Sequence, residues 1–101
     1  LHEYPDNQCE IAAIVVDETY TNLGIGKKII SYLMEKAAKL NHKAVFVLTT
    51  HTSDWFLQLG FTPATIADLP EQKQQDYFKR KRNSRILRYP LSENNETFPD
   101  D

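Results

Sequence analysis

The sequence predicts an α/β fold in which a mixed sheet is built around a central βαβ unit. Two apolar runs of strand length, at 11–16 and 44–48, flank a helix-length segment whose apolar residues recur at helical spacing. This order predicts two parallel strands joined by a right-handed crossover. Because the chain has 101 residues, we expect one folded domain.

The first apolar run follows Glu10 and is rich in β-branched residues. A continuous apolar run of this length is typical of a strand that is covered on both faces. Turn-forming residues at 4–8 precede it. We therefore expect residues 1–2 to end an earlier strand that a hairpin joins to this one.

The helix is predicted to begin at a glycine turn at 23–28 and to end at Asn41 and His42. Its apolar stripe, which we expect to face the sheet, consists of Ile25, Ile29, Ile30, Leu33, Met34, Ala37 and Leu40. The second strand follows at 44–48 and closes with Thr49 and Thr50.

A short helix is predicted after this strand. Ser53 is placed to cap it, and Gly60 is placed to end it. The apolar residues that the helix carries are Trp55, Phe56 and Leu59. A short strand is then expected to start at Phe61.

The last predicted elements are a helix and a strand. Pro70 suits the first position of a helix that runs to about residue 77 or 78, after a connection at 63–69. Alternation at 84–89 predicts a strand with Ile86 on one face and Leu87 and Tyr89 on the other. Residues 92–101 are acidic and polar, so we expect a disordered tail after a folded part at 1–91.

Composition narrows the class of protein. No apolar run approaches the length of about 20 residues that a membrane span needs, and the net charge of −2 gives no overall attraction to nucleic acid. Cys9 is the only cysteine and is interpreted as a small buried residue, which fits a reducing, cytoplasmic setting. The three histidines have no metal-ligand spacing, so no metal is expected. The first residues lack Met and are interpreted as the middle of a longer chain.

The glycine turn is the most informative motif. Gly24 and Gly26 stand at the start of the long helix, where the first backbone amides have no partner within the helix and the helix dipole adds positive charge. Such a turn suits a pyrophosphate, although the glycines could also serve only a tight turn. Ile29 occupies the position where a dinucleotide-binding motif needs its third glycine, and no Walker A sequence is present.

This motif resembles the Arg/Gln-x-x-Gly-x-Gly/Ala signature of acyl-CoA-binding enzymes of the GNAT fold, with Thr21 at the Arg/Gln position. The resemblance implies that acetyl-CoA is the cosubstrate. It places the pyrophosphate on six residues, which are Leu23, Gly24, Ile25, Gly26, Lys27 and Lys28. It also implies that the pantetheine arm pairs with the backbone of Ile14, Val15 and Val16.

Further strings are similar to the acetyltransferase domain of bacterial N-acetylglutamate synthases. They are Glu10-Ile11-Ala12, the run at 45–50, Trp55-Phe56 with Gly60-Phe61, Asp68-Leu69-Pro70 and the segment at 82–87. The likeness covers the C-terminal part of that domain, to Leu91, and the front of the domain is missing. It implies transfer of an acetyl group to the α-amine of L-glutamate, in arginine biosynthesis, by direct attack in a ternary complex.

The resemblance also implies roles for single residues. It implies that Glu10 is the general base, although Glu10 could instead be a solvated carboxylate at a strand end. The substrate-binding residues are Arg82, Ser84 and Thr49, with Lys73 as a weaker candidate. Many GNAT enzymes carry a tyrosine acid where this chain has Phe56.

Other functions stay open on the sequence alone. The chain could use another acceptor amine, or it could be a half-domain that binds coenzyme A without catalysis. If the first apolar strand forms an open edge, a homodimer or strand exchange is expected. The basic cluster at 79–82 could instead be a solvated face or a nucleic-acid patch.

Overall fold

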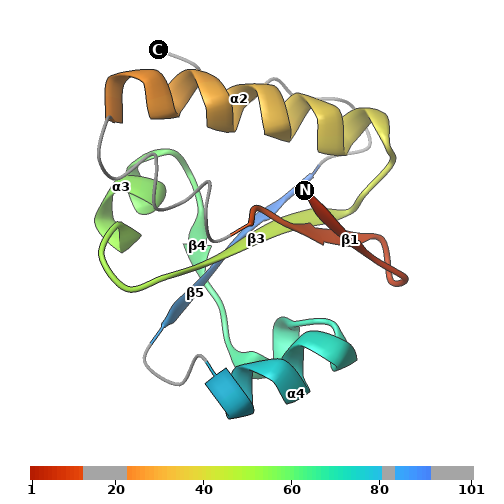
Figure 1. Cartoon of the computed structure of the whole chain (residues 1–101). Helices are drawn as coiled ribbons and strands as arrows, with labels where there is room; N and C mark the ends of the chain where they lie inside the picture. Colours follow the sequence, from red (N-terminus) through yellow and green to blue (C-terminus); the bar gives the residue numbers. More distant parts are fainter. Residues whose placement is uncertain (13–22, 81–83, 92–101) are drawn as a thin grey trace.

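The computed structural model describes residues 1–12, 23–80 and 84–91 (Figure 1). The elements are β1 (His2–Tyr4), β2 (Gln8–Glu10), α2 (Leu23–Lys39), β3 (Ala44–Thr49), α3 (Ser53–Gln58), β4 (Thr62–Pro63), the 3₁₀ helix η1 (Ile66–Asp68), α4 (Glu71–Arg80) and β5 (Arg85–Pro90). The strands form one five-stranded sheet in the order β1-β2-β3-β5-β4.

The sheet is mixed, as predicted. β2 and β3 are parallel and are connected through α2, whereas the other neighbouring strands are antiparallel. The central βαβ unit is therefore confirmed. The register places Cys9 beside Val45 and Glu10 beside Phe46. The parallel pairing continues past β2, since the amide of Ile11 donates to the carbonyl of Phe46 at 3.1 Å.

The position of the first strand differs from the prediction. The described strand is Gln8–Glu10, so it begins where turn residues were expected, and residues 13–16 of the predicted strand lie outside the described residues. Pairing on both sides, with β1 and with β3, outweighs the turn propensity of Gln8. The predicted hairpin is confirmed, and its turn includes Asn7 in the left-handed conformation, with φ 62°.

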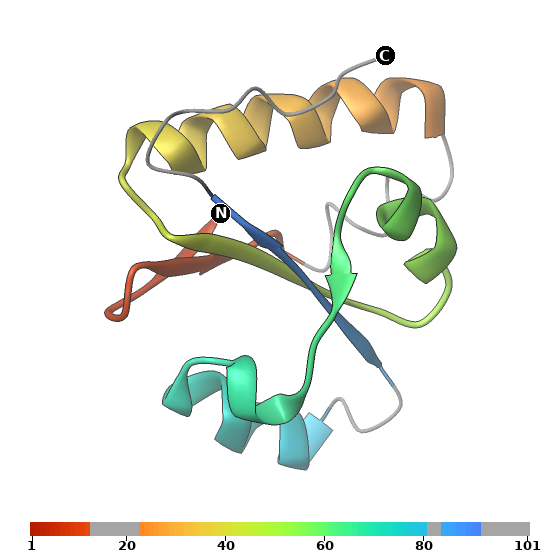
Figure 2. The same cartoon turned by 180° about the vertical axis from the view of Figure 1, so that it is seen from behind.

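This pairing bears on only part of the prediction about the sheet edge. The apolar strand at 11–16 was expected to be the open edge; β1 pairs with Gln8–Glu10, before that run, and residues 13–16 lie outside the described residues. Within the described part of the chain, the two edge strands are β1 and β4 (Figure 2). A homodimer or strand exchange at the sheet edge stays a prediction.

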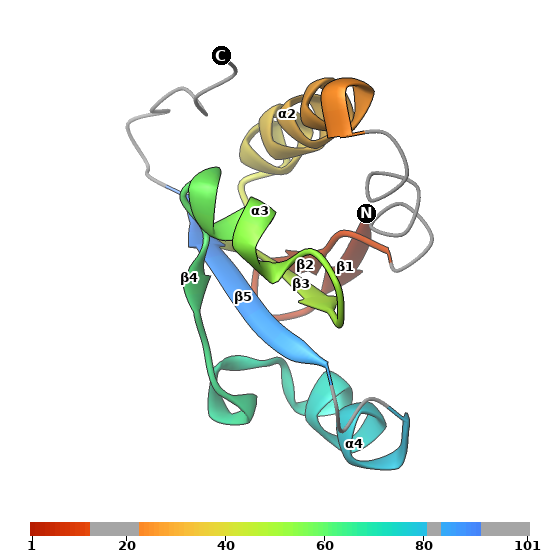
Figure 3. The same ribbon diagram turned by 90° about the vertical axis from the view of Figure 1, so that its left-hand side faces the viewer.

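Two layers of helix enclose the sheet (Figure 3). α2 and α3 cover one face, which we call the α2 face, and its core includes Ile30, Met34, Val45, Phe56 and Leu87. α4 covers the opposite face, called the α4 face, with a smaller core of Phe46, Leu48, Leu69, Tyr77 and Ile86. The expected division of Ile86 from Leu87 in the last strand is thus confirmed.

The apolar stripe of α2 is narrower than predicted. Ile30, Met34 and Ala37 are buried, but Ile25 is 56% exposed and Leu40 is 46% exposed. A straight helix meets a sheet along one line, so residues at the margins of a wide stripe remain in solvent. Among the described helices, none is long and apolar enough to cross a membrane.

The end of α2 is closed by backbone hydrogen bonds. Asn41 has a φ of 65°, and its amide donates to the carbonyl of Ala38 at 3.0 Å. The amide of His42 reaches back to the carbonyl of Ala37 at 3.2 Å. These two bonds form a Schellman motif, in which Asn takes the left-handed position that Gly more often occupies. The predicted helix end at Asn41 and His42 is confirmed.

Two boundaries in the second half shift slightly. Ser53 is the first residue of α3 rather than its cap, and the cap position belongs to Thr52, which makes no side-chain capping bond. The hydroxyl of Thr52 instead lies 2.7 Å from that of Thr49. α4 begins at Glu71, after Pro70, and continues to Arg80, past the predicted end.

Gly60 allows the predicted ending of α3, and it provides a stability test. Its φ is +105°, and an added Cβ would lie 3.0 Å from Cε2 of Tyr89. We expect Gly60→Ala to lower the free energy of unfolding by about 1–3 kcal/mol, because the strained backbone and the contact both oppose it. Urea unfolding measures the loss. Asn41→Gly is the control, because Asn41 also has a positive φ and Gly adopts that conformation without strain. This variant should not destabilise the protein. Equal losses of unfolding free energy in the two variants would contradict the prediction.

Candidate active site

A cavity of about 240 Å³ lies on the α4 face of the sheet, near the end of β2. Three strands and α4 contribute to it. Its lining residues are His2, Tyr4, Glu10, Ala12, Leu48, Lys73 and Asp76. Most of these residues are polar or charged, so the cavity offers several groups that could hydrogen-bond or pair with a bound molecule.

The strand register brings the lining residues together. His2 is the direct partner of Glu10 in the β1–β2 pair, and Glu10 is the partner of Phe46 in the β2–β3 pair. Because side chains alternate along a strand, Tyr4 and Leu48 lie on the same face as these residues. The α4 face therefore carries both a small apolar core and the polar cavity.

Glu10 is the central group of this site. It is only 7% exposed, and Nζ of Lys73 lies 3.1 Å from its Oε1. The phenol of Tyr4 donates a hydrogen bond to the same oxygen at 3.3 Å. Lys73 also lies 3.6 Å from Oδ2 of Asp76. Because Glu10 is buried and held by two side chains, the alternative of a solvated carboxylate at a strand end is wrong.

The protonation of Tyr4 follows from its surroundings. Burial, together with the charge and hydrogen bond of Glu10 and the charge of Asp76, raises the pKa of Tyr4 to about 12. The phenol therefore stays protonated at neutral pH and serves as a hydrogen-bond donor to Glu10.

Two members of this site, Tyr4 and Asp76, were not predicted from the sequence. Tyr4 was interpreted only as a turn residue, and Lys73 was predicted only as a weaker substrate ligand and not as a partner of Glu10. Helical spacing gives the missing signal for Lys73 and Asp76, because these residues share the sheet-facing side of α4 with the buried Tyr77. No local pattern could have indicated Tyr4, whose contact depends on the register of the hairpin.

The predicted phosphate-binding residues lie at the start of α2, on the other face of the sheet. Leu23 is the first residue of this 17-residue helix, and its first turn contains no acidic side chain. Gly24, Ile25 and Lys28 are exposed, Lys27 is half-buried and Gly26 is buried. This end of α2 is thus accessible and carries cations suited to an anion. Ile14, Val15 and Val16 lie outside the described residues.

Of the predicted substrate residues that the structure describes, Lys73 lines the cavity, whereas Thr49 and Ser84 do not. Thr49 is buried, and its hydroxyl accepts hydrogen bonds from the amides of Thr52 at 3.0 Å and His51 at 3.3 Å. Ser84 is half-buried, and its carbonyl accepts a bond from the phenol of Tyr77 at 2.9 Å. Arg82 lies outside the described residues. The substrate roles of all four stay predictions.

Phe56 is closed within the core of the α2 face. It is 0% exposed and packs edge to face against Trp55 and Phe61, with ring centroids 5.0 and 5.1 Å apart. A residue in this environment cannot meet a reacting group, so no acid acts from this position in this chain.

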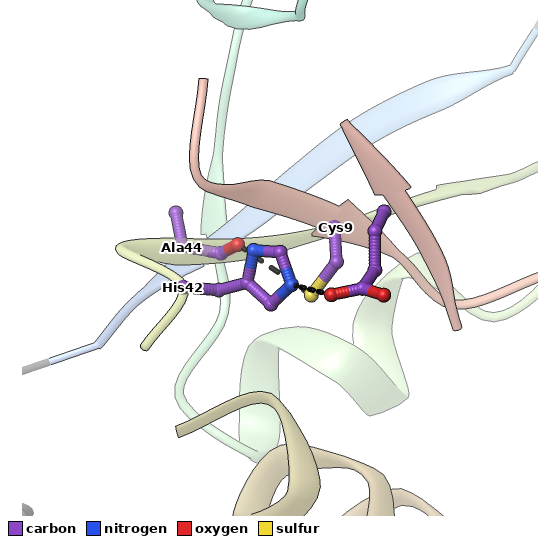
Figure 4. A network of polar contacts seen from close by, with 4 residues as sticks. Cys9, His42 and Ala44 are labelled. Carbon is purple, nitrogen blue, oxygen red and sulfur yellow. Dashed lines mark hydrogen bonds and ion pairs between the residues drawn. The ribbon is translucent and has the colours of Figure 1, made fainter. Parts of the chain in front are cut away.

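A second polar cluster lies between the hairpin and the start of β3 (Figure 4). Nε2 of the buried His42 lies 2.6 Å from Oε1 of Glu3, and Sγ of Cys9 lies 3.9 Å from the carbonyl of Ala44. Burial raises the pKa of the Cys9 thiol to about 11, which keeps it protonated and unreactive at neutral pH. The interpretation of Cys9 as a buried residue is confirmed. No group of three or more metal-ligating side chains occurs in the described ranges.

Comparison with known proteins gives one consistent family. The family described as "Acetyltransferase (GNAT) family" matches residues 1–61. The amino-acid acetyltransferase of Mannheimia succiniciproducens is 36% identical over 94 residues, which are 92% of this chain and 21% of that protein. The amino-acid acetyltransferase of Pasteurella multocida is 39% identical over 88 residues, or 86% of this chain and 20% of that protein. The chain thus spans about a fifth of the length of these curated relatives.

Solved structures agree with the sequence comparison. The N-acetylglutamate synthase from Neisseria gonorrhoeae, complexed with coenzyme A and N-acetyl-glutamate, matches with a TM-score of 0.72 and 28% identity. The match covers 91% of this chain and 22% of that chain. The same synthase complexed with coenzyme A and L-arginine matches with a TM-score of 0.67 and 29% identity, over 90% of this chain and 21% of that chain.

Proposed function

The chain belongs to the GNAT acetyltransferase family, and on that premise we propose that it binds acetyl-CoA and transfers the acetyl group to the amine of an amino acid. The observation that carries this proposal is the buried Glu10 in a polar cavity, held by a tyrosine and a lysine. The names of the relatives and the coenzyme A in the matching structures support the same chemistry.

We propose L-glutamate as the acceptor, so that the product is N-acetylglutamate, an intermediate for arginine biosynthesis. The likeness to N-acetylglutamate synthase over 91% of this chain supports this choice. Lys73 offers a cation in the cavity, and Arg82 and Ser84 remain candidates for the carboxylates of the substrate. The single cysteine, buried and without a disulfide partner, fits a cytoplasmic enzyme.

The reaction needs a neutral amine. In the proposed mechanism, Glu10 takes a proton from the ammonium group of the acceptor, and the amine nitrogen then attacks the thioester carbonyl of acetyl-CoA. The nitrogen of the tetrahedral intermediate gives up its second proton to solvent. The intermediate collapses, the carbon–sulfur bond breaks and coenzyme A leaves as a thiolate that takes a proton from solvent. Glu10 returns its proton to solvent after product release. The chain needs no covalent acetyl-enzyme for this sequence of steps.

Coenzyme A is proposed to bind at the start of α2. The pyrophosphate would lie on residues 23–28, where the first amides of the helix are free, Gly24 leaves the backbone open, and Lys27 and Lys28 add positive charge. The pantetheine contact with Ile14, Val15 and Val16 remains part of this proposal.

Binding of coenzyme A can be tested with a charge at this turn. We expect Gly24→Glu to lower the affinity for coenzyme A at least about tenfold, because the new carboxylate repels the pyrophosphate. Titration calorimetry measures this affinity. The same carboxylate favours the helix start, so the fold should persist. Gln75→Glu adds the same charge at an exposed position of α4 and is the matched control. Equal affinities of the two variants would contradict the proposed site.

The acceptor is tested by following release of the coenzyme A thiol with a panel of amino acids, in the natural protein that carries this sequence. L-glutamate should be acetylated fastest. If only another amine were acetylated, the proposal of L-glutamate as the acceptor would be wrong, and the proposal of acetyl transfer to an amine would stand. Binding of coenzyme A without turnover of any amine would instead indicate a non-catalytic binding domain.

A further inference from the structure

We propose that Tyr4 is a positioning residue, whose phenol holds the Glu10 carboxylate in the orientation in which it accepts the proton of the acceptor amine. The inference rests on the proposed function of Glu10 as the base. It assigns a role in acetyl transfer to β1, an element that no sequence motif connected with the chemistry.

The first support is how the carboxylate is held. The terminal torsion of a glutamate side chain has a broad distribution, so neighbouring groups must fix its direction. The phenol of Tyr4 donates to Oε1 at 3.3 Å, and Nζ of Lys73 lies 3.1 Å from the same oxygen. These contacts come from β1 and from α4, and together they fix one oxygen from two separate elements.

The second support is the rigidity of Tyr4 itself. Its ring packs on Phe46, with centroids 5.8 Å apart, and lies beside His2, with centroids 6.4 Å apart. The β1–β2 register places it opposite Gln8, which makes it the diagonal neighbour of Glu10 on one face. The phenol is therefore set by the sheet, whereas Lys73 has a long side chain that it also shares with Asp76 at 3.6 Å.

The third support is the location and chemistry of the hydroxyl. Tyr4 lines the cavity together with Glu10, so it contacts the base at the place where the acceptor would enter. Its pKa of about 12 keeps the phenol a donor through the pH range in which an amine can be acetylated. It therefore orients the carboxylate and does not compete with it for the proton.

A double-mutant cycle in the natural protein tests the proposal. Tyr4→Phe keeps the ring and its packing, and it removes only the donor. We expect kcat to fall about tenfold while KM for acetyl-CoA stays unchanged. If Tyr4 acts through Glu10, the same substitution in a Glu10→Gln background should cost less than about twofold. Tyr32→Phe, at a position of α2 that is 65% exposed, is the matched control and should not change kcat.

Equal losses in the two backgrounds would overturn the proposal, and so would an unchanged kcat in Tyr4→Phe. Either result leaves the proposed function intact if Glu10→Gln lowers kcat by about 10²-fold or more. A second measurement stands apart from activity. The tyrosinate absorbance that Tyr4→Phe removes should titrate near pH 12 in the unmodified chain and at lower pH in Glu10→Gln, because the charge and hydrogen bond of Glu10 raise the pKa of Tyr4. An unmoved titration would show that the contact is absent and would also overturn the proposal.

Discussion

Glu10→Gln should lower kcat for acetyl transfer by about 10²–10⁴-fold, the usual contribution of a general base. Glutamine keeps the size of the side chain and can still accept a bond from Tyr4, but it cannot take the proton of the ammonium group. The half-buried Lys73 also loses its charged partner at 3.1 Å and keeps the ion pair with Asp76 at 3.6 Å. Initial rates with acetyl-CoA and L-glutamate give the measurement.

The fold should survive this substitution, because the core residues of both faces are unchanged. Glu35→Gln is the matched control, since Glu35 is exposed on α2 and the same atoms are exchanged. Its kcat should equal that of the unmodified protein. If Glu10→Gln kept more than about a tenth of the activity, Glu10 would not be the base, and the proposed mechanism would need another group.

Phe56→Ala should lower the free energy of unfolding by about 3–5 kcal/mol, because it removes a fully buried aromatic ring from the core of the α2 face. The two edge-to-face contacts, with Trp55 and Phe61, are lost together. A domain of this size has a total stability of only about 5–15 kcal/mol, so a large part of it depends on this one ring.

Urea unfolding at equilibrium measures this loss. Leu57→Ala is the control from the same helix, because Leu57 is 38% exposed and its removal leaves little cavity. The control should lose less than about 1 kcal/mol. A similar loss in the two variants would mean that α3 does not anchor the core. Phe56→Tyr is informative as well, since a hydroxyl there would enter the core and should destabilise the protein without supplying an acid.

The long apolar elements could be predicted from the sequence because they carry their own signal. The run at 44–48 and the helical spacing of Ile30, Met34 and Ala37 are the parts of the fold that the structure places as expected. Ile25 and Leu40 extend the same spacing, and they are nevertheless exposed. The spacing of apolar residues predicts which side of a helix faces the sheet, but it does not predict how wide the contact is.

The parts that could not be predicted depend on contacts between distant residues. β2 has only three residues and turn-forming neighbours, so its existence depends on pairing with β1 and β3. The candidate site also depends on contacts that pairing and packing create. Glu10 was predicted by resemblance. Its partner Tyr4 comes from the other strand of the hairpin, and its partner Lys73 comes from a helix more than sixty residues further along the chain. Local patterns contain no information on such pairs.

Cys9 and Glu10 are neighbours in the chain, yet one is closed inside the α2 face and the other faces the cavity. A slip of one residue in β2 would exchange them, leaving a carboxylate in an apolar core and a thiol in the place of the base. In natural variants of this protein, the hairpin at 5–7 should therefore resist insertions and deletions of single residues, while the connection between β4 and α4 should vary in length more freely. Among related proteins, the number of residues in the hairpin should therefore vary less than the residue types that fill it.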